Sequence, residues 1–193
     1  MRDKPTGAGR STFDLVDASR LFAEVGLSEG PVLLDVGCGL GDYVLAAARH
    51  VTGSGKAYAI DLWDDAVDAL KSQLRASGTQ NLDARVADVS EHIPVDDDAI
   101  DIVLMVAVLH DLLREDRHDA AVKEITRVLA PAGTVAVVEF EKQEGPPGPP
   151  IDVRLASKEV ERILHPHGLQ LLKMGEVGPH HYLSIFHLGD GSA

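Results

Sequence analysis

The chain has 193 residues, which is the size of one globular domain with a single core. Its 31 Asp and Glu residues against 18 Lys and Arg residues give a formal net charge of −13, which repels the phosphates of nucleic acid and anionic lipid. We therefore expect neither nucleic acid nor a membrane surface as a partner. The one cysteine, Cys38, excludes a disulfide or a multi-thiolate metal site within one chain, and no resident metal is expected.

The N-terminal residues 1–11 are expected to form a loose tail. They lack the apolar segment of a secretory signal, and the longest apolar run, at 99–110, is too short to span a bilayer, so we expect a cytoplasmic protein. Apolar residues from Phe13 onward recur near helical spacing. This pattern predicts an N-terminal helix within 12–29 that ends at Gly26.

Residues 30–142 alternate between strand and helix patterns. Short apolar runs predict strands, and the amphipathic segments between them predict helices. The predicted strands cover 32–36, 56–61, 82–88, 99–109 and 134–140, and the predicted helices cover 41–51, 64–78 and 115–133. Strands that alternate with helices and are apolar on both faces are typical of a parallel sheet with helices on both sides.

A Gly/Pro loop at 143–150 precedes a C-terminal part at 151–193. This part is expected to contain a helix at 157–168 capped by Ser157, followed by two strands at 169–177 and 180–188. Strands joined by so short a turn can only be antiparallel. The sequence therefore predicts one α/β domain with a doubly wound, mostly parallel, seven-stranded Rossmann-like sheet whose last strand is antiparallel.

The turn after the first predicted strand contains glycines at alternate positions, in the stretch "LLDVGCGLGDY" at 33–43. Gly37, Gly39 and Gly41 occupy the first strand-to-helix turn, which is where open α/β sheets bind ligands. Glycine permits positive φ and a close approach of backbone to a ligand. Tight packing of the helix on the strand is the alternative reason for glycine here.

Acidic residues near this turn indicate which ligand it suits. Asp42 stands where the dinucleotide fingerprint has its third glycine, and Asp35 lies on the other side of the turn. Both carboxylates would repel a pyrophosphate and attract an ammonium or a sulfonium. Asp61 and Asp88 close the next two strands, where carboxylates can bind ribose hydroxyls and an adenine amine. Each acid alone could instead cap a helix, but together they favour an adenosine ligand with a positively charged head.

Residues 30–140 resemble the class I S-adenosylmethionine-dependent methyltransferases. "VLLDVGCGLGDY" is similar to the glycine motif of that family, "AIDL" to its ribose acid, "VADV" to its adenine strand, and "EITRVLAPAGTVAVVEF" to its later helix-to-strand step. The resemblance implies S-adenosylmethionine as the cofactor. Cys38 is most simply a small residue packed beneath the glycine loop. The residues it implies around the cofactor are Asp35, Gly37, Cys38 and Gly39 at the methionine part, Asp61 at the ribose, Leu62, Asp88 and Val89 at the adenine, and Val106 nearby.

Methyl transfer from a sulfonium needs alignment of the reacting atoms, and it needs a base only when the nucleophile is protonated. Three residues are candidates for catalysis. His110 follows the fourth strand at the cofactor end of the sheet, Glu139 lies in the apolar fifth strand, and His181 lies near the start of the last strand. The alternatives are that His110 packs at a strand end and that Glu139 pairs with a buried base. His180 and His181 could contact substrate, but as neighbours on a strand they point to opposite faces and suit a metal poorly.

We therefore expect a single methyltransferase domain over 1–193 that transfers a methyl group from S-adenosylmethionine to a small-molecule acceptor, either as a monomer or as a homodimer. A non-catalytic S-adenosylmethionine sensor or partner subunit is one alternative. A nucleotide-cofactor oxidoreductase is another.

Overall fold

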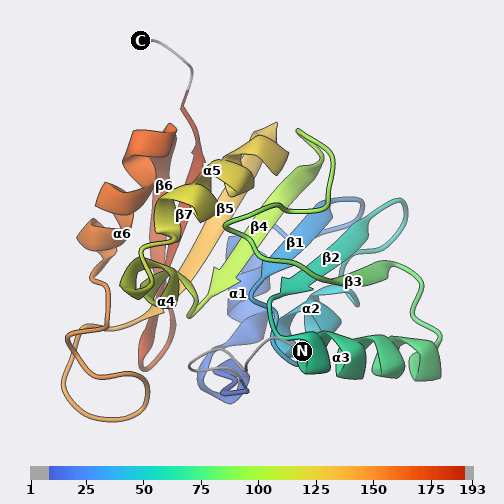
Figure 1. Ribbon diagram of the computed structural model, residues 1–193, viewed down its shortest axis with the longest axis horizontal. Coiled ribbons are helices and arrows are strands. Elements are labelled where there is room, and N and C mark those ends of the chain that lie inside the picture. Colours follow the sequence, from blue (N-terminus) through green and yellow to red (C-terminus); the bar gives the residue numbers. More distant parts are fainter. Residues whose placement is uncertain (1–8, 190–193) are drawn as a thin grey trace.

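The computed structural model describes residues 9–189 as one seven-stranded sheet with the strand order β3-β2-β1-β4-β5-β7-β6 (Figure 1). All neighbouring pairs are parallel except those that β7 makes with β5 and β6. The predicted Rossmann-like architecture with a reversed last strand is thus confirmed. The strands are β1 Val32–Val36, β2 Lys56–Asp61, β3 Leu82–Val86, β4 Ile100–Val106, β5 Leu129–Phe140, β6 Leu169–Gly178 and β7 His181–Leu188.

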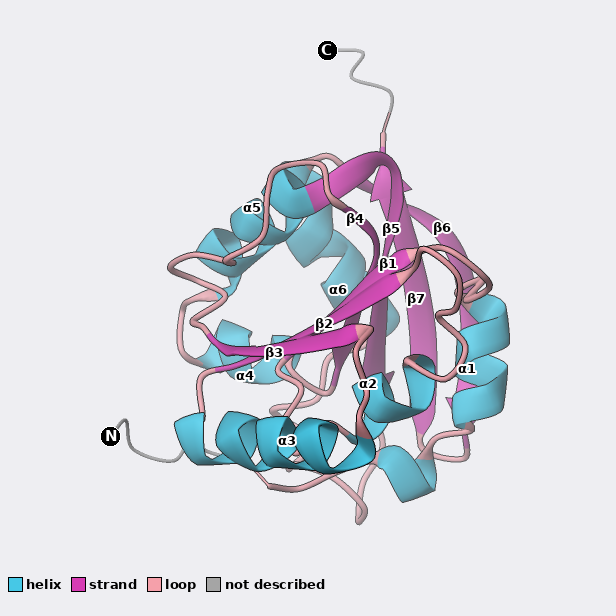
Figure 2. Cartoon of the chain, turned by 90° about the vertical axis from the view of Figure 1, so that its right-hand side faces the viewer, coloured by secondary structure: helices cyan, strands magenta, loops and turns pink. Residues whose placement is uncertain are grey.

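Helices cover both faces of the sheet (Figure 2). The helices α1 Ala18–Glu24, α2 Asp42–Ala47 and α3 Asp64–Ser77 share one hydrophobic cluster with the sheet. The helices α4 Leu109–Arg114, α5 His118–Val128 and α6 Ser157–Leu164 share a second cluster on the opposite face. Two cores on one sheet explain why the central strands are apolar on both sides.

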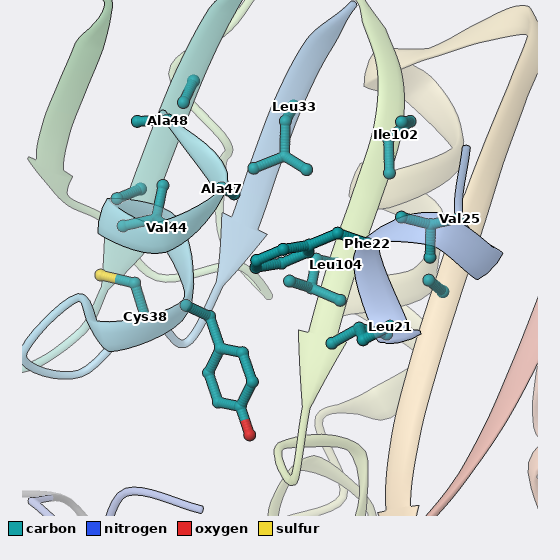
Figure 3. Close-up of a cluster of buried hydrophobic side chains, with 14 of the residues drawn as sticks. Leu21, Phe22, Val25, Leu33, Cys38, Val44, Ala47, Ala48, Ile102 and Leu104 are labelled. Atoms are coloured by element: carbon teal, nitrogen blue, oxygen red, sulfur yellow. The ribbon is translucent and has the colours of Figure 1, made fainter. Parts of the chain in front are cut away.

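The central strand β1 shows this burial residue by residue. Leu33 and Leu34 are neighbours that point to opposite faces, and both are fully buried. On the first face, Leu33 of β1 and Leu104 of β4 pack beside Phe22 of α1 and Val44 of α2 (Figure 3). The parallel pairing of β1 with β4, in which Val36 lies opposite Met105, sets their carboxyl ends beside each other where the glycine turn begins.

The N-terminal helix predicted within 12–29 is present and ends just before Gly26, but it starts later than the pattern predicts. The structure has a 3₁₀ turn, Phe13–Leu15, and then α1. Val16 is extended between them, and the Asp17 carboxylate caps α1 by accepting from the Arg20 N–H at 3.0 Å. The backbone N–H of Asp17 donates to the carbonyl of Val177 on β6 at 2.7 Å, so a tertiary contact breaks the helical pattern.

The segment after β4 also differs from the prediction. The short helix α4 follows the strand, and the predicted helix at 115–133 is confined to α5. Ala107 has a φ of 54°, which ends β4 and starts the turn into α4. Leu129 is extended and pairs with Ile100 in the sheet, so β5 begins there rather than at 134.

The C-terminal part follows the prediction except at the start of α6. Ser157 is the first helical residue rather than the cap. Glu159 instead reaches back, and its carboxylate accepts from the Ala156 N–H at 2.8 Å. The helix ends at Leu164, followed by a 3₁₀ turn and Gly168 in the left-handed region.

The segment of the Gly/Pro loop is organised by a buried arginine. Arg154 is 2% exposed, and its guanidinium lies against the ring of Phe140. Its hydrogen bonds all go to backbone carbonyls, at 2.9 Å to Pro149, 3.1 Å to Glu141, 2.6 Å to Gly145 and 2.7 Å to Pro147. One side chain therefore ties together four backbone carbonyls of residues 141–149.

We expect Arg154→Met to lower the free energy of unfolding by about 2–3 kcal/mol, because four backbone carbonyls lose one buried, charged donor together. Urea unfolding followed by circular dichroism would measure this loss. Arg162→Met, at an exposed position on α6, is the matched control and should change stability by less than about 1 kcal/mol. Equal losses in the two variants would contradict the organising role.

Candidate functional site

A cavity of about 200 Å³ lies at the carboxyl ends of β1 to β4. The nine residues expected around the cofactor all line it, although they come from four different strands and turns. They are Asp35, Gly37, Cys38, Gly39, Asp61, Leu62, Asp88, Val89 and Val106. The parallel topology brings them together, because the carboxyl ends of neighbouring strands meet at one edge.

The glycine turn needs glycine for different reasons at its three positions. Gly39 has a φ of 52° with open space where a Cβ would stand, so its requirement is conformational. A Cβ on Gly37 would lie 2.6 Å from Val108 Cγ2, and one on Gly41 would lie 2.6 Å from Leu70 Cδ1. Gly41 therefore serves the packing of α3, whereas Gly37 and Gly39 bring bare backbone to the cavity.

Asp61 ties this turn to the end of β2. One of its carboxylate oxygens accepts from the Gly39 N–H at 2.7 Å, and the other accepts from the Trp63 N–H at 2.8 Å. The N–H groups of Gly37 and Cys38 both donate to the carbonyl of Ile60, at 2.9 and 3.0 Å. Each Asp61 oxygen has lone pairs left for a ligand hydroxyl. Asp61 thus shapes the turn and remains able to bind a ribose.

Asp35 is a buried acid beside the cavity. It is 2% exposed, and its Oδ2 oxygen has no hydrogen-bond partner among residues 9–189. Burial raises the pKa of Asp35 to about 7, and the charges of Asp61 and Asp42 add to that shift. An arriving ammonium would give the unpartnered oxygen a donor and stabilise the ionised form. The residues present therefore fit the amino group of S-adenosylmethionine.

Asp88 follows β3 and carries a network of hydrogen bonds. Its Oδ1 oxygen accepts from the N–H of Ser90 at 2.9 Å, from the Ser90 hydroxyl at 2.7 Å, and from the guanidinium of Arg117. Burial opposes ionisation of Asp88, but the Ser90 hydrogen bonds and the Arg117 charge outweigh it and lower the pKa. A carboxylate in this state accepts hydrogen bonds only.

His110 and Glu139 come together, but neither lines the cavity. The His110 ring is buried, with Nδ1 2.8 Å from one Glu139 oxygen, while the His110 N–H donates to the other at 3.1 Å. Burial acts to lower the pKa of His110, but its hydrogen bond to Glu139 and the charge of Glu139 prevail and raise it. The structure thus pairs Glu139 with a buried base, as the alternative interpretation holds. The neighbouring Asp111 does line the cavity, and its carboxylate is 3.8 Å from His110 Nε2.

His181 lies away from both the cavity lining and His110. It is fully buried, its ring centroid is 4.2 Å from that of Phe140, and neither ring nitrogen has a hydrogen-bond partner in the described part of the chain. Burial lowers the pKa of His181 to about 4, and the charges of His180 and Arg154 act in the same direction. The three candidates for catalysis therefore occupy two separate places.

Several cavity residues were not predicted from the sequence. Residues 9–11, expected in a loose tail, line the cavity, whereas residues 1–8 of that tail lie outside the described range. Thr12 and Tyr43 also line it, and their hydroxyl oxygens are 2.9 Å apart. Tyr43 ends the glycine stretch and could have been found from that position. Arg117 has no such sequence pattern around it.

The cavity lining is acidic. Among the described residues, six carboxylates and two guanidinium groups line the cavity. They are Asp35, Asp42, Asp61, Asp88, Asp111 and Glu115, with Arg10 and Arg117. This excess favours a positively charged ligand. Residues 9–189 contain no group of three or more His, Cys, Asp or Glu placed to hold a metal. Within the same range no helix is both long and apolar enough to cross a membrane.

Comparison with known proteins identifies the family. A family model described as "Methyltransferase domain" matches residues 34–137. The chain belongs to this methyltransferase family. A solved structure of an S-adenosylmethionine-dependent methyltransferase from Aquifex aeolicus superposes with a TM-score of 0.84 at 28% identity, covering 92% of this chain and 93% of that one. Family and fold favour S-adenosylmethionine over a nicotinamide dinucleotide as the cofactor.

Curated relatives include two named for quinone biosynthesis. The demethylmenaquinone methyltransferase of Lactobacillus johnsonii is 28% identical over 127 residues, which is 66% of this chain and 51% of the relative. A ubiquinone/menaquinone biosynthesis C-methyltransferase of Idiomarina loihiensis is 28% identical over 117 residues, 61% of this chain and 45% of the relative. The chain thus spans about half the length of these relatives.

Proposed function

We propose that this protein transfers a methyl group from S-adenosylmethionine to a small-molecule acceptor. The observation that carries the proposal is the unpartnered, buried Asp35 oxygen beside a bare glycine turn in an acidic cavity. In this proposal Asp35, Gly37 and Gly39 receive the methionine part. Asp61 binds the ribose, and Leu62, Asp88, Val89 and Val106 surround the remainder, with Cys38 beneath the loop.

The residues of the chain then act mainly by alignment and by exclusion of water. The bound cofactor supplies a methyl group made electrophilic by the sulfonium. Transfer would form a bond between the acceptor and the methyl carbon as the carbon–sulfur bond breaks, and the electron pair of the broken bond would remain on sulfur. The segment 9–12, held to Tyr43 through Thr12, covers the cavity while this occurs.

The acceptor proton, where there is one, has a nearby carboxylate to receive it. Asp111 lines the cavity, and burial raises its pKa against the opposing charges of His110 and Arg114. In this proposal His110 and Glu139 hold α4 in place, so that Asp111 rather than His110 meets the acceptor. His181 begins β7 beside the end of β5 but is fully buried and outside the cavity lining, so this proposal gives it no contact with the acceptor.

A small acceptor is supported by the relatives and by the cavity wall. One curated relative is named a demethylmenaquinone methyltransferase and another a ubiquinone/menaquinone biosynthesis C-methyltransferase. Val106, Val108 and Leu112 give the cavity an apolar wall that suits a ring. A non-catalytic sensor of S-adenosylmethionine is the second candidate, because the glycine turn and the cavity acids support cofactor binding without requiring transfer.

The test combines binding with turnover. Calorimetric titration with S-adenosylmethionine, S-adenosylhomocysteine and NAD should show binding of the first two and none of NAD. Release of S-adenosylhomocysteine would then be followed with a reduced naphthoquinone and with a panel of small phenols and amines. Binding together with product formation supports the proposal. Binding without transfer to any acceptor favours the sensor, and binding of NAD alone overturns the cofactor assignment.

A further inference from the structure

The Asp88 carboxylate is held unequally at its two oxygens. Its Oδ1 accepts three hydrogen bonds, two from Ser90 and one from Arg117. No residue within 9–189 donates to Oδ2 in the same way. The side chain is about 10% exposed and lines the cavity. One oxygen is thus fully occupied by the protein, and the other is left for a ligand.

Arg117 reaches Asp88 from a distant part of the chain. It stands in the turn between α4 and α5, and its own N–H donates to the Leu112 carbonyl at 2.9 Å. Its Nε donates to the Ser90 hydroxyl at 3.0 Å, and its Nη1 donates to Glu115 at 3.1 Å. All three guanidinium nitrogens are therefore engaged, and the planar fork fixes the orientation of the Asp88 carboxylate.

The local turn at Asp88 does not require this arginine. Ser90 alone closes an Asx-type turn on Oδ1 through its N–H and its hydroxyl. Arg117 adds a charged donor on the same oxygen from 29 residues further along the chain, and it lines the same cavity. If Arg117 only stabilised this turn, its position in the cavity lining would have no function.

We propose that Arg117 is the positioning residue for adenine recognition: by occupying Asp88 Oδ1 it presents Oδ2 as a fixed acceptor for a 6-amino purine and against a 6-oxo purine. This inference rests on the cofactor site described above. An exocyclic amine donates to a carboxylate oxygen, whereas a 6-oxo group brings a second acceptor against it. A polar site arranged for one hydrogen-bond pattern rejects the ligand that lacks it.

The test compares two ligands that differ at this position. The probes are S-adenosylhomocysteine and S-inosylhomocysteine, titrated calorimetrically into the wild type, Arg117→Met, Arg117→Lys and the control Arg114→Met. We expect the wild type to prefer the adenine ligand by roughly tenfold or more, and Arg117→Met to lose most of that preference. Arg117→Lys should recover only part of it, because a lysine offers a single point charge. Arg114 lies on α4, pairs with Asp111 and is absent from the cavity lining, so its variant should keep the wild-type ratio.

The pH at which the preference for the adenine ligand is lost is an independent test of the role of Arg117. The charged groups near Asp88 are Arg117 and Glu115 at the α4–α5 turn, with Asp61 and Asp111 on other walls of the cavity. The lowered pKa of Asp88 keeps the carboxylate ionised as the pH falls. In Arg117→Met, burial raises the pKa of Asp88 with less opposition. As the pH falls, this variant should therefore lose its preference for adenine at a higher pH than the wild type does, because a protonated Asp88 can donate to the 6-oxo group.

Each outcome decides the matter. A folded Arg117→Met protein that keeps the wild-type ratio, or that loses affinity for both ligands equally, would show that Arg117 is only a tether between α5 and β3. Failure of the wild type to bind S-adenosylhomocysteine would overturn the cofactor site itself. A collapsed ratio with an upward shift in pH supports the positioning role.

Discussion

Asp61→Ala is expected to weaken the binding of S-adenosylhomocysteine about 100-fold or more. The substitution removes the acceptors proposed for the ribose hydroxyls, and hydrogen bonds to a charged group contribute about 1.5–3 kcal/mol each. It also removes the carboxylate that holds the Gly39 and Trp63 N–H groups at 2.7 and 2.8 Å. The ligand contacts and the shape of the glycine turn are therefore lost together. Isothermal titration calorimetry of the purified variant measures the change.

The matched control is Asp65→Ala. Asp65 lies in the first turn of α3, is exposed, and is not part of the cavity lining. The Asp65→Ala substitution removes one negative charge close to the same strand end, so it measures how far the electrostatic potential of the acidic cavity alone affects binding. We expect its dissociation constant to stay within about threefold of the wild type, since exposed charges are screened. Equal losses in Asp61→Ala and Asp65→Ala would mean that charge alone, rather than a ribose contact, governs binding.

The meeting of the proposed cofactor residues in one cavity could be predicted because local patterns and topology agree. The strand β2 matches its predicted bounds, with Asp61 as its last residue. An acid at the end of a parallel strand is carried to the same sheet edge as every other strand end. Asp35, Asp61 and Asp88 therefore meet in one cavity even though no sequence pattern links them directly.

The remaining parts of the site depend on contacts between distant segments. Arg117 and Asp88 lie 29 residues apart and meet only because the α4–α5 turn folds over the end of β3. The direction of the His110 ring follows from the turn at Ala107, whose positive φ starts a helix that was not predicted. A histidine near a cofactor suggests catalysis from the sequence, but the helix turns this one toward β5.

The buried pair on β5 and α4 yields the second large effect. We expect Glu139→Ala to lower the free energy of unfolding by about 3–5 kcal/mol. The substitution removes a fully buried carboxylate and leaves the buried His110 without the two hydrogen bonds that this carboxylate accepts. The double variant His110→Leu/Glu139→Leu should be less destabilised than the sum of the single variants, since apolar groups can replace a buried pair together. Strict additivity in urea unfolding would show that the two residues do not act as a unit.

The same pair predicts how stability depends on pH. Glu139 raises the pKa of His110 in the folded protein above its ordinary value of 6.5, so the folded state binds that proton more tightly than the unfolded chain does. The resulting stabilisation is fully present below about pH 6.5 and is lost as the pH rises through the folded-state pKa. Unfolding measured from pH 6 to 9 should therefore show a decline that Glu139→Gln flattens, because the amide removes the charge that holds the proton. A decline that persists unchanged in Glu139→Gln would assign the pH dependence to another group and leave His110 neutral in the fold.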